Sequence, residues 1–420
     1  MKIRDIEIRD RLQLEKLEGM YLAPYALKST QANSTRLIPE KEHPYRTAFQ
    51  RDRDRIIHSR AFRRLKHKQQ VFVISEGDHF RTRLTHTLEV SQLARTMAKS
   101  LGLNEDLVEA IALGHDLGHT PFGHTGEFVL NNILSGRDTL DDILPLKNFG
   151  GFKHNYQSLR VVDKIEKRYQ FDGLNLTAFV REGLLKHTKL KRHFFSYPDF
   201  FKDGIHFDLD CATTLEGQVV AICDEIAQRT HDLEDGIRAG FVELEEVRQL
   251  EIVRIVEEKF SIYHLLNDDR YGYRNALING LITVLVTDVI KKSYEMINKF
   301  FQRKKRLNYF DEEIVQFSDN INPKQLKLDA FINNNIIFKA SNKKITNKNT
   351  NIIRKLFLYY FQNPYQLPEY ILNRFYEGKK EIEDLKKQTS DERFVRITAD
   401  HIAGMTDRFA ELELVRLSEK

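Results

Sequence analysis

Apolar residues recur every three to five positions along much of the chain, a spacing typical of helices that bury one face. The clearest case runs from Arg83 to Leu101, where the apolar positions are Leu84, Leu88, Leu93, Met97 and Leu101. We expect Gly102 to end this helix and Asn104 to cap a second one that extends to about Gly114. The strict alternation typical of strands is scarce, so the pattern predicts a mainly α fold.

Further helices are expected near residues 158–169 and 177–189, and from a cap at Thr213 or Thr214 to about Ala227. From about residue 240 to the C-terminus the pattern stays mostly helical. Two segments, 335–340 and 392–398, could be short β pieces. The polar run Ser341–Thr350 predicts an exposed loop.

Composition narrows the class of protein. The chain has 420 residues and only two cysteines, so a disulfide framework is excluded and a reducing compartment is expected. The charged N-terminus lacks the apolar stretch of a secretory signal, and no run of 18 apolar residues predicts a membrane span. We therefore expect a cytoplasmic protein with no membrane partner.

The net charge of +5 is mild for this length, but positive charge is concentrated in one block. Residues 51–68, RDRDRIIHSRAFRRLKHK, hold eight Lys and Arg against two Asp. Two interpretations stay open: these cations bind a nucleotide, with Arg63 among the best candidates, or they lie on a solvated helix face.

Histidines beside acidic residues carry the candidate chemistry. His115 and Asp116 are adjacent at the expected end of a helix, where two neighbouring side chains can reach one ion and where Gly114 and Gly118 leave room. His86 lies near the start of the preceding helix. Asp224 interrupts an apolar helical segment, and a buried carboxylate needs a partner or an ion. Each residue alone is compatible with a core histidine or a salt bridge, but the set predicts a site for a metal that accepts nitrogen and oxygen ligands.

The pattern H…HD…D resembles the HD superfamily of metal-dependent phosphohydrolases. Longer segments resemble its deoxyguanosine triphosphate triphosphohydrolase (dGTPase)-like family: HPYRTAFQRDRDRIIHSRAFRRLKHKQQVF, GDHFRTRLTHTLEV, GLNEDLVEAIALGHDLGHTPFGHTGE, FKHNYQSLRVV, DEIAQRTHDLEDG and IAGMTDRFA. With the looser match YLAPYALKSTQANSTR, the resemblance extends from Tyr21 to Ala410. It implies an all-α enzyme in which an activated water attacks the α-phosphate of a deoxynucleoside triphosphate (dNTP), releasing deoxynucleoside and inorganic triphosphate.

The resemblance also implies partners and domains. One divalent ion (Mg, Mn, Fe, Co, Ni or Zn) is expected, together with a homo-oligomer, a tetramer or hexamer, and a nucleotide or single-stranded DNA activator. The expected division is an irregular N-terminal segment over 1–50, an HD catalytic core over 51–240, and a helical region over 241–420 that completes the pocket and the oligomer contacts.

Site residues follow from the resemblance position by position. The expected metal ligands are His86, His115, Asp116 and Asp224. His124 and Glu127 match the catalytic pair, and their i, i+3 spacing would let the carboxylate orient the imidazole. The substrate-binding candidates are Arg83, His119, Asp232, Arg63 and Gln228. Of these, Asp232 would lie near the sugar 3′-OH, and Gln228 replaces a tyrosine common in the family, which bears on sugar and base selection.

Two alternatives remain. An HD phosphodiesterase or phosphatase acting on other nucleotides would need extra ligands for a second ion, which His154 and His187 could supply. A nucleotide-sensing or nucleic-acid-binding oligomer would keep the metal site without the reaction.

Overall fold

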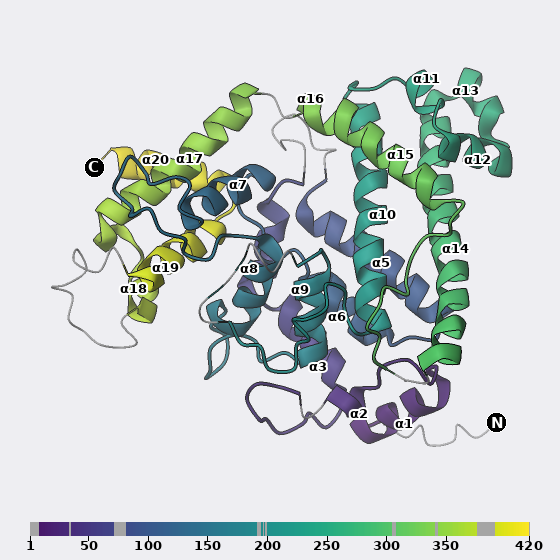
Figure 1. Ribbon diagram of the computed structural model, residues 1–420, viewed down its shortest axis with the longest axis horizontal. Coiled ribbons are helices and arrows are strands. Elements are labelled where there is room, and N and C mark those ends of the chain that lie inside the picture. The colour runs from purple at the N-terminus through teal and green to yellow at the C-terminus, as the bar shows by residue number, and fades with distance from the viewer. Residues whose placement is uncertain are drawn as a thin grey trace.

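Helices make up nearly all the regular structure of this protein. The computed structural model describes residues 8–32, 35–70, 81–190, 195, 197, 200–304, 308–340, 343–375 and 391–419. Within these ranges no β-strand is formed, and extended backbone pairs only at the isolated bridges Gln69–Thr82 and Lys167–Gly173 (Figure 1). The predicted all-α class is confirmed.

The first half of the chain builds the helices that surround the candidate site. In order they are α1 (Arg11–Tyr21), α2 (Ser29–Ala32), α3 (Ala48–Ile57), α4 (Arg60–Arg64), the 3₁₀ turn η1 (Leu65–His67), α5 (Arg83–Ser100), α6 (Glu105–Gly114), α7 (His124–Leu134), α8 (His154–Arg160), the π-helix η3 (Val161–Ile165), α9 (Ala178–Lys186) and α10 (Leu215–Arg238).

The second half extends the fold on both sides. Its elements are α11 (Leu244–Val247), α12 (Glu251–Phe260), η4 (Ile262–His264), α13 (Leu265–Asp268), α14 (Arg270–Lys304), α15 (Asn322–Ile332), the π-helix η5 (Asn333–Ile337), α16 (Phe338–Ala340), α17 (Lys343–Gln362), η6 (Pro364–Gln366), α18 (Glu369–Phe375), α19 (Glu392–Ala403) and α20 (Asp407–Ser418).

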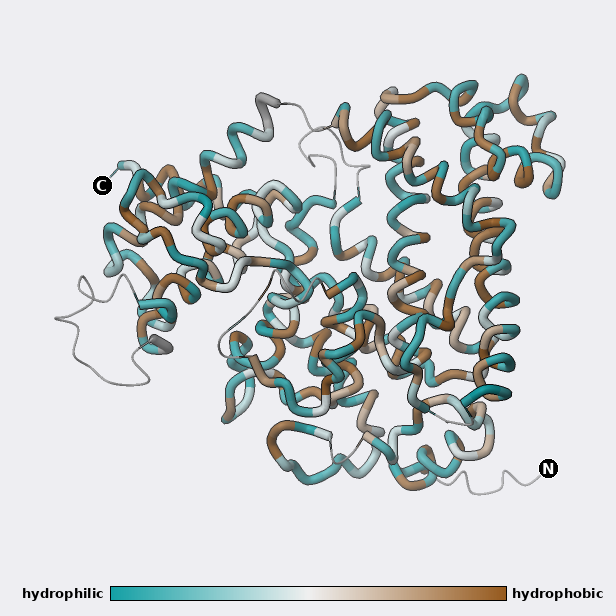
Figure 2. The backbone as a smooth tube through the Cα atoms, viewed as in Figure 1, coloured by the Kyte–Doolittle hydropathy of each residue, from teal (hydrophilic) through white to brown (hydrophobic). Residues whose placement is uncertain are grey.

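Buried apolar side chains form two clusters rather than one. In the first cluster, α5, α6, α9, α10 and α14 pack together around residues such as Val90, Ile111 and Leu281. Figure 2 shows hydrophobic residues returning along α10 and α14 with hydrophilic residues between them, as this packing requires. The three-part division of the chain stays a prediction.

The second cluster joins an early helix to the end of the chain. α7 packs against α17 and α19, and α17 packs against α20, around Leu130, Phe357 and Phe394 (Figure 1). Since α6 belongs to the first cluster and α7 to the second, residues 115–123 between them lie at the junction of the two clusters.

The predicted helix ends are confirmed where a side chain caps the backbone. Asn104 accepts a hydrogen bond from the amide of Leu107 at 3.2 Å, and Thr214 accepts from the amide of Gly217 at 3.1 Å. Gly102 has φ +68° and follows α5, and a Cβ there would lie 3.1 Å from Cβ of Ala23. Both the backbone angle and the close approach explain why this position is glycine.

Three local predictions are wrong. Residues 335–340 are helical, in η5 and α16, and residues 392–398 lie in α19. In α19 the buried residues Phe394, Val395, Thr398 and Ile402 recur at helical spacing, and Asp391 caps the helix by accepting from Arg393 N at 2.7 Å. The polar run expected as a loop is helical from Lys343 to Thr350, within α17; its first two residues lie outside the described ranges. The helix expected near 158–169 begins earlier, at His154.

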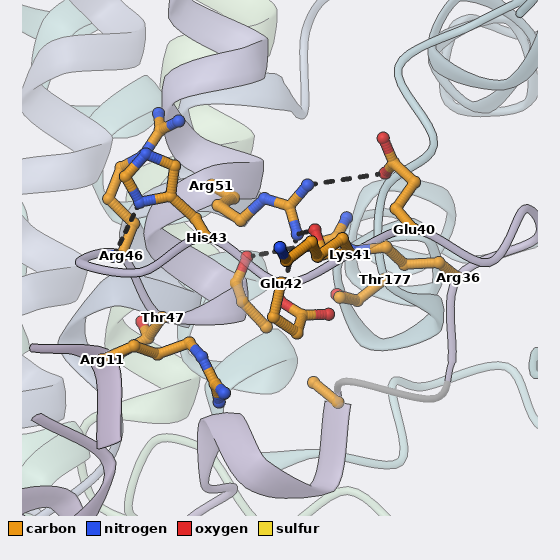
Figure 3. A network of polar contacts seen from close by, with 12 residues as sticks. Arg11, Arg36, Glu40, Lys41, Glu42, His43, Arg46, Thr47, Arg51 and Thr177 are labelled. Atoms are coloured by element: carbon orange, nitrogen blue, oxygen red, sulfur yellow. Dashed lines mark hydrogen bonds and ion pairs between the residues drawn. The ribbon is translucent and has the colours of Figure 1, made fainter. Parts of the chain in front are cut away.

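Part of the basic block serves the fold. Figure 3 shows residues 36–46 lying against α3, where Arg51 contacts Glu42 at 3.0 Å and Glu40 at 3.7 Å. Arg36 donates to Oδ1 of Asp52 at 2.6 Å, and it also donates to the carbonyl of Asn175. Arg51, and also Arg55 with Glu40 at 2.9 Å, thus pair with carboxylates of the N-terminal region, while Asp52 of the block pairs with an N-terminal arginine.

None of the helices in the described ranges has the length and apolar character that crossing a membrane requires.

One buried carboxylate joins the N-terminal segment to the start of α10. Oε1 of Glu216 accepts from the amides of Leu27 at 2.9 Å and Asn104 at 3.2 Å. Burial outweighs these bonds and raises the pKa of Glu216 from 4.5 to about 7. Because the folded state binds this proton more tightly than the unfolded state does, the stability it contributes is fully present below pH 4.5 and is lost as pH rises through about 7.

Glu216→Gln keeps an oxygen acceptor for both amides but cannot ionise. We expect the stability of the variant relative to wild type to increase between pH 5 and pH 8, by on the order of 1–3 kcal/mol. Urea unfolding followed by circular dichroism at both pH values measures this difference. Glu251→Gln, at an exposed position in the first turn of α12, is the matched control and should show no such trend. An equal difference at both pH values for Glu216→Gln would contradict the assignment.

Candidate metal centre and active site

Three helices converge on the predicted metal ligands. α5 begins at Arg83, and its first turns bury Arg83 and His86 on one face. His115 and Asp116 follow the last turn of α6 and are both buried, while Asp224 projects from the middle of α10. Because α5, α6 and α10 pack against one another, residues far apart in the sequence meet at one point.

The four predicted ligands lie close to one another. Nε2 of His86 is 2.9 Å from Oδ1 of Asp224, and Nε2 of His115 is 3.6 Å from the same oxygen. Nε2 of His115 is also 3.4 Å from Oδ1 of Asp116. Donor atoms of His86, His115 and Asp116 all fall within 4.8 Å of one another, an arrangement that could hold a metal ion.

The orientation of His115 fits a ligand. Its Nδ1 lies 2.7 Å from the carbonyl of Ala112, which fixes the donor there. Its Nε2 is buried without a hydrogen-bond partner and faces the two carboxylates at distances too long for a hydrogen bond. An unpartnered buried nitrogen beside two carboxylate oxygens matches the two-nitrogen, two-oxygen ligand set of a divalent transition metal.

Close packing against α8 holds the loop that carries these ligands. A Cβ at Gly118 would lie 2.2 Å from the carbonyl oxygen of His154 and from the amide of Ser158, so only glycine fits. The hydroxyl of Ser158 accepts from the amide of Gly118 at 2.9 Å and donates to the carbonyl of His115 at 2.7 Å. The loop therefore depends on α8 for its shape.

Two further side chains contact Asp116. Nη1 of Arg83 donates to Oδ2 of Asp116 at 2.8 Å, and Nε2 of His119 lies 3.0 Å from Oδ1. The ring of His119 stacks on that of His154 with centroids 3.9 Å apart. The structure thus brings Arg83 and His119 to the cluster, as predicted.

Glu127 pairs with a different histidine from the one expected. Its Oε2 lies 2.7 Å from Nδ1 of His154, on α8. His124 is the first residue of α7 and is exposed, with its ring 6.1 Å from that of His119. The i, i+3 spacing does place His124 and Glu127 in one turn of α7, but the polar contact of Glu127 runs across to α8.

The remaining predicted substrate-binding residues, Asp232, Gln228 and Arg63, differ in how far they are exposed to solvent. Asp232 is buried on α10 and Gln228 is half-buried one turn before it, so both follow Asp224 along one helix. Burial, together with Asp235, raises the pKa of the Asp232 carboxyl to about 8. Arg63 is exposed on α4 and borders a surface hollow with His58 and Arg60, so the structure does not bring it to the metal cluster.

The sequence did not single out two residues, Lys68 and Asp407, that join the loop after Asp116 to the last two helices. The buried ammonium of Lys68 donates to the carbonyls of His119 and, at 2.9 Å, Ala403. Asp407, at the start of α20, accepts from the amides of Phe122 and Gln69, each at 2.9 Å. Both residues lie in segments that carry the family resemblance, and that is the only signal that could have singled them out.

The charges of the cluster determine its protonation. Burial opposes ionisation of Asp116 and Asp224, but neighbouring histidines, with Arg83 at Asp116, hold the pKa of both carboxyls well below the usual range. Burial would also lower the pKa of His115, yet Asp116 and Asp224 raise it to about 9. Burial and the neighbouring His115 and His154 lower the pKa of His187 to about 3, so this ring stays neutral.

A second group of side chains could also hold an ion. Donor atoms of His119, Glu127 and His154 lie within 4.8 Å of one another, and Nδ1 of His119 is buried without a hydrogen-bond partner. The rings of His115 and His187 lie 5.2 Å apart, so both histidines considered for a second ion are close to the first cluster.

Two known domain families match parts of this chain, and known proteins match nearly all of it. The HD domain family matches residues 83–229, and a phosphohydrolase-associated domain matches residues 315–416. The chain is 41% identical over 410 residues to a deoxyguanosinetriphosphate triphosphohydrolase-like protein of Brucella canis, covering 95% of this chain and 96% of that protein.

Other proteins with the same description match to a similar extent. The protein of Bartonella tribocorum is 40% identical over 404 residues, covering 92% of this chain and 93% of its own length. That of Geobacter metallireducens is 40% identical over 401 residues, covering 95% of each chain.

Metal binding at this cluster should depend on pH through His115. Because Asp116 and Asp224 raise the pKa of His115 to about 9, an ion that binds Nε2 below this pH must displace the hydrogen on that nitrogen. We expect Mn²⁺ affinity to rise with pH below 9, by up to about tenfold per unit for this one proton. Calorimetric titration with Mn²⁺ in buffers of different ionisation enthalpy, between pH 6.5 and 9, measures both affinity and proton release. Constant affinity without proton release would contradict the prediction.

Proposed function

The chain belongs to the deoxyguanosinetriphosphate triphosphohydrolase-like family of HD-domain phosphohydrolases, and on this basis we propose that it hydrolyses deoxynucleoside triphosphates to deoxynucleoside and inorganic triphosphate. The observation that carries the proposal is the convergence of two histidines and two carboxylates from α5, α6 and α10 on one point. Arg83 and His119 lie directly beside it and could bind phosphate oxygens.

His86, His115, Asp116 and Asp224 are the proposed ligands of one divalent ion. When bound, such an ion polarises a phosphate and makes a bound water more acidic. The side chains of Asp224 and Glu127 are each 16% exposed, so both carboxylates are partly accessible from outside the cluster. The identity of the ion is left open by this ligand set, which suits several divalent metals.

Arg83 and His119 are proposed to bind the phosphates. The guanidinium of Arg83 is fixed by Asp116 and lies against Gly123, where a Cβ would be 3.3 Å from Nη2. A guanidinium held in this way offers several donors to phosphate oxygens without reorganising. His119, stacked on His154, is held rigidly on the same side.

Proton transfer is proposed for the group on α7 and α8. His124, exposed at the start of α7, can exchange protons with solvent and with a leaving group. Glu127 is anchored by His154 rather than by His124, so its carboxylate keeps one orientation near the metal cluster. We assign His124 and Glu127 the catalytic roles and His154 the role of holding Glu127.

The nucleoside is proposed to lie along α10. Asp232, with a carboxyl that is largely protonated at neutral pH, can both donate to and accept from a sugar hydroxyl. Gln228 presents an amide where the family commonly has a tyrosine, so the sugar would meet a hydrogen-bonding group rather than an aromatic face.

Assembly is also part of the proposal. The exposed side of α20 carries Phe409, Leu412 and Val415, an apolar stripe that could take part in self-association. A tetrameric or hexameric assembly, a nucleotide or single-stranded DNA activator, and a role for Arg63 in binding nucleotide stay predictions.

The products test the reaction type. We expect the purified protein with Mn²⁺ to convert dNTPs to deoxynucleoside and inorganic triphosphate, detected by anion-exchange chromatography. Each dNTP should be supplied alone and then all four together, because an activating nucleotide can be required. Release of pyrophosphate would contradict the proposed reaction. Two ions per chain, with His119→Ala losing one, would favour the phosphodiesterase alternative, since His119, Glu127 and His154 could hold the second.

Variants on α7 test the catalytic assignment. His124→Ala and Glu127→Gln should each lower kcat by roughly 10²–10⁴-fold, because both remove a group that moves or orients a proton in the transition state. Mn²⁺ affinity should stay at the wild-type level, since neither residue is a proposed ligand. His264→Ala, at an exposed histidine of η4, is the matched control and should retain full activity. Unchanged kcat in both α7 variants would contradict the assignment. Nucleotide binding without turnover of any dNTP, supplied alone or in the mixture, would favour the nucleotide-sensing alternative.

A further inference from the structure

His86 has a second polar neighbour, outside the four proposed ligands. On one side its Nε2 lies 2.9 Å from Asp224, and on the other its Nδ1 lies 3.2 Å from Nδ1 of His231. Nε2 of His231 in turn contacts the carboxylate of Glu89. Glu89 is on α5 and His231 on α10, so a continuous line of side chains runs from Glu89 through His231 and His86 to the metal centre.

The protons along this line follow from which atoms can donate. An ionised carboxylate only accepts, so Nε2 of His231 carries the hydrogen that Glu89 receives. In a neutral imidazole the other nitrogen then has the lone pair, and Nδ1 of His231 must accept. When an ion occupies the site, Nδ1 of His86 therefore donates to His231, and Nε2 of His86 gives its lone pair to the ion instead of sharing a hydrogen with Asp224.

We infer that His231 and Glu89 are positioning residues that hold His86 in the tautomer and ring orientation a divalent ion requires. The inference rests on the proposed function, because it takes His86 as a ligand. Ligating histidines commonly donate their second ring N–H to a fixed acceptor, and loss of that acceptor typically weakens metal binding. Here the acceptor is another imidazole, which Glu89 fixes.

The network around Glu89 offers a purely structural explanation that must be separated from this one. Nε of Arg81 lies 3.4 Å from Glu89, and the same guanidinium contacts Glu234 at 2.6 Å and Asp235 at 3.0 Å. These ion pairs join the start of α5 to the end of α10. Glu234 shares Arg81 with Glu89 but makes no contact with His231 or His86 among its described interactions, so it provides a matched control.

Glu89→Gln is the first test. The amide can donate to Nε2 of His231 and so reverse the tautomer, which would place a hydrogen on Nε2 of His86 where the ion must bind. We expect the Kd for Mn²⁺, measured by electron paramagnetic resonance of the free ion, to rise roughly 10–100-fold. Glu234→Gln removes the same charge from the same cation and should bind Mn²⁺ as wild type does. The melting temperature of the metal-free protein should match between the two variants.

Two substitutions of His231 are the second test, because one removes the hydrogen-bond acceptor of His86 and the other restores an acceptor. His231→Leu removes the acceptor and should weaken Mn²⁺ binding as Glu89→Gln does. His231→Asn places an oxygen acceptor near the position of Nδ1, so it should bind Mn²⁺ more tightly than His231→Leu. Adding Glu89→Gln to His231→Asn should have little further effect, because the asparagine no longer needs Glu89 to set its proton.

The outcomes separate this inference from the proposed function. His86→Ala should abolish tight Mn²⁺ binding; if it does not, the ion binds elsewhere and both proposals fail. If His86→Ala abolishes binding while Glu89→Gln and His231→Leu bind as wild type does, the metal site stands and the positioning role is overturned. Equal weakening by Glu89→Gln and Glu234→Gln would also overturn it, since the effect would then come from charge alone.

Discussion

The arrangement of this site depends on two carboxylates, the buried Asp116 and the largely buried Asp224, which both lie near Nε2 of His115. Each would cost several kcal/mol to place there without compensation. The compensation comes from Arg83 and His119 at Asp116 and from His86 and His115 at Asp224. The raised pKa of His115 indicates that the two carboxylates favour positive charge at this imidazole, and the proposed divalent cation would supply positive charge in its place. The same electrostatic demand thus accounts for the cations and imidazoles around the two carboxylates and for the proposal that a divalent ion binds there.

That cluster sits where the two hydrophobic clusters of the fold meet, so its geometry depends on both. α5, α6 and α10 supply the four proposed ligands from one side, while the loop after Asp116 passes to α7 on the other. Lys68 and Asp407 hold this loop against the last two helices of the chain. The residues after Ala399 therefore support the candidate active site although none of them is a proposed ligand or catalytic residue, which agrees with the phosphohydrolase-associated domain match over this region.

Much of the fold and the ligand cluster could be predicted from the sequence because they depend on local rules. Helical periodicity and capping residues such as Asn104 and Thr214 can be recognised within a few neighbouring residues. His115 and Asp116 are adjacent in the sequence, so their proximity can be predicted without knowledge of the fold. The failures involve contacts between distant segments. The spacing of Glu127 suggested a partner within its own helix, but the close approach of α8 at Gly118 brings His154 nearer. Residues 392–398 look ambiguous in isolation, and their helical form depends on packing against α17.

Two carboxylate–imidazole pairs lie beside the cluster of proposed ligands, and each has a different proposed role. On one side Glu89 fixes His231, which can act only through His86; on the other, Glu127 fixes His154, whose ring stacks on His119 beside Asp116. Each pair converts an imidazole that could adopt either tautomer into one with a defined donor and a defined acceptor. The first pair bears on how an ion is held and the second on the groups proposed to move protons. Histidines whose protons are placed by a carboxylate, a backbone carbonyl or a fixed imidazole need little reorganisation when a substrate binds, and such preorganisation is what lets fixed charges lower a reaction barrier.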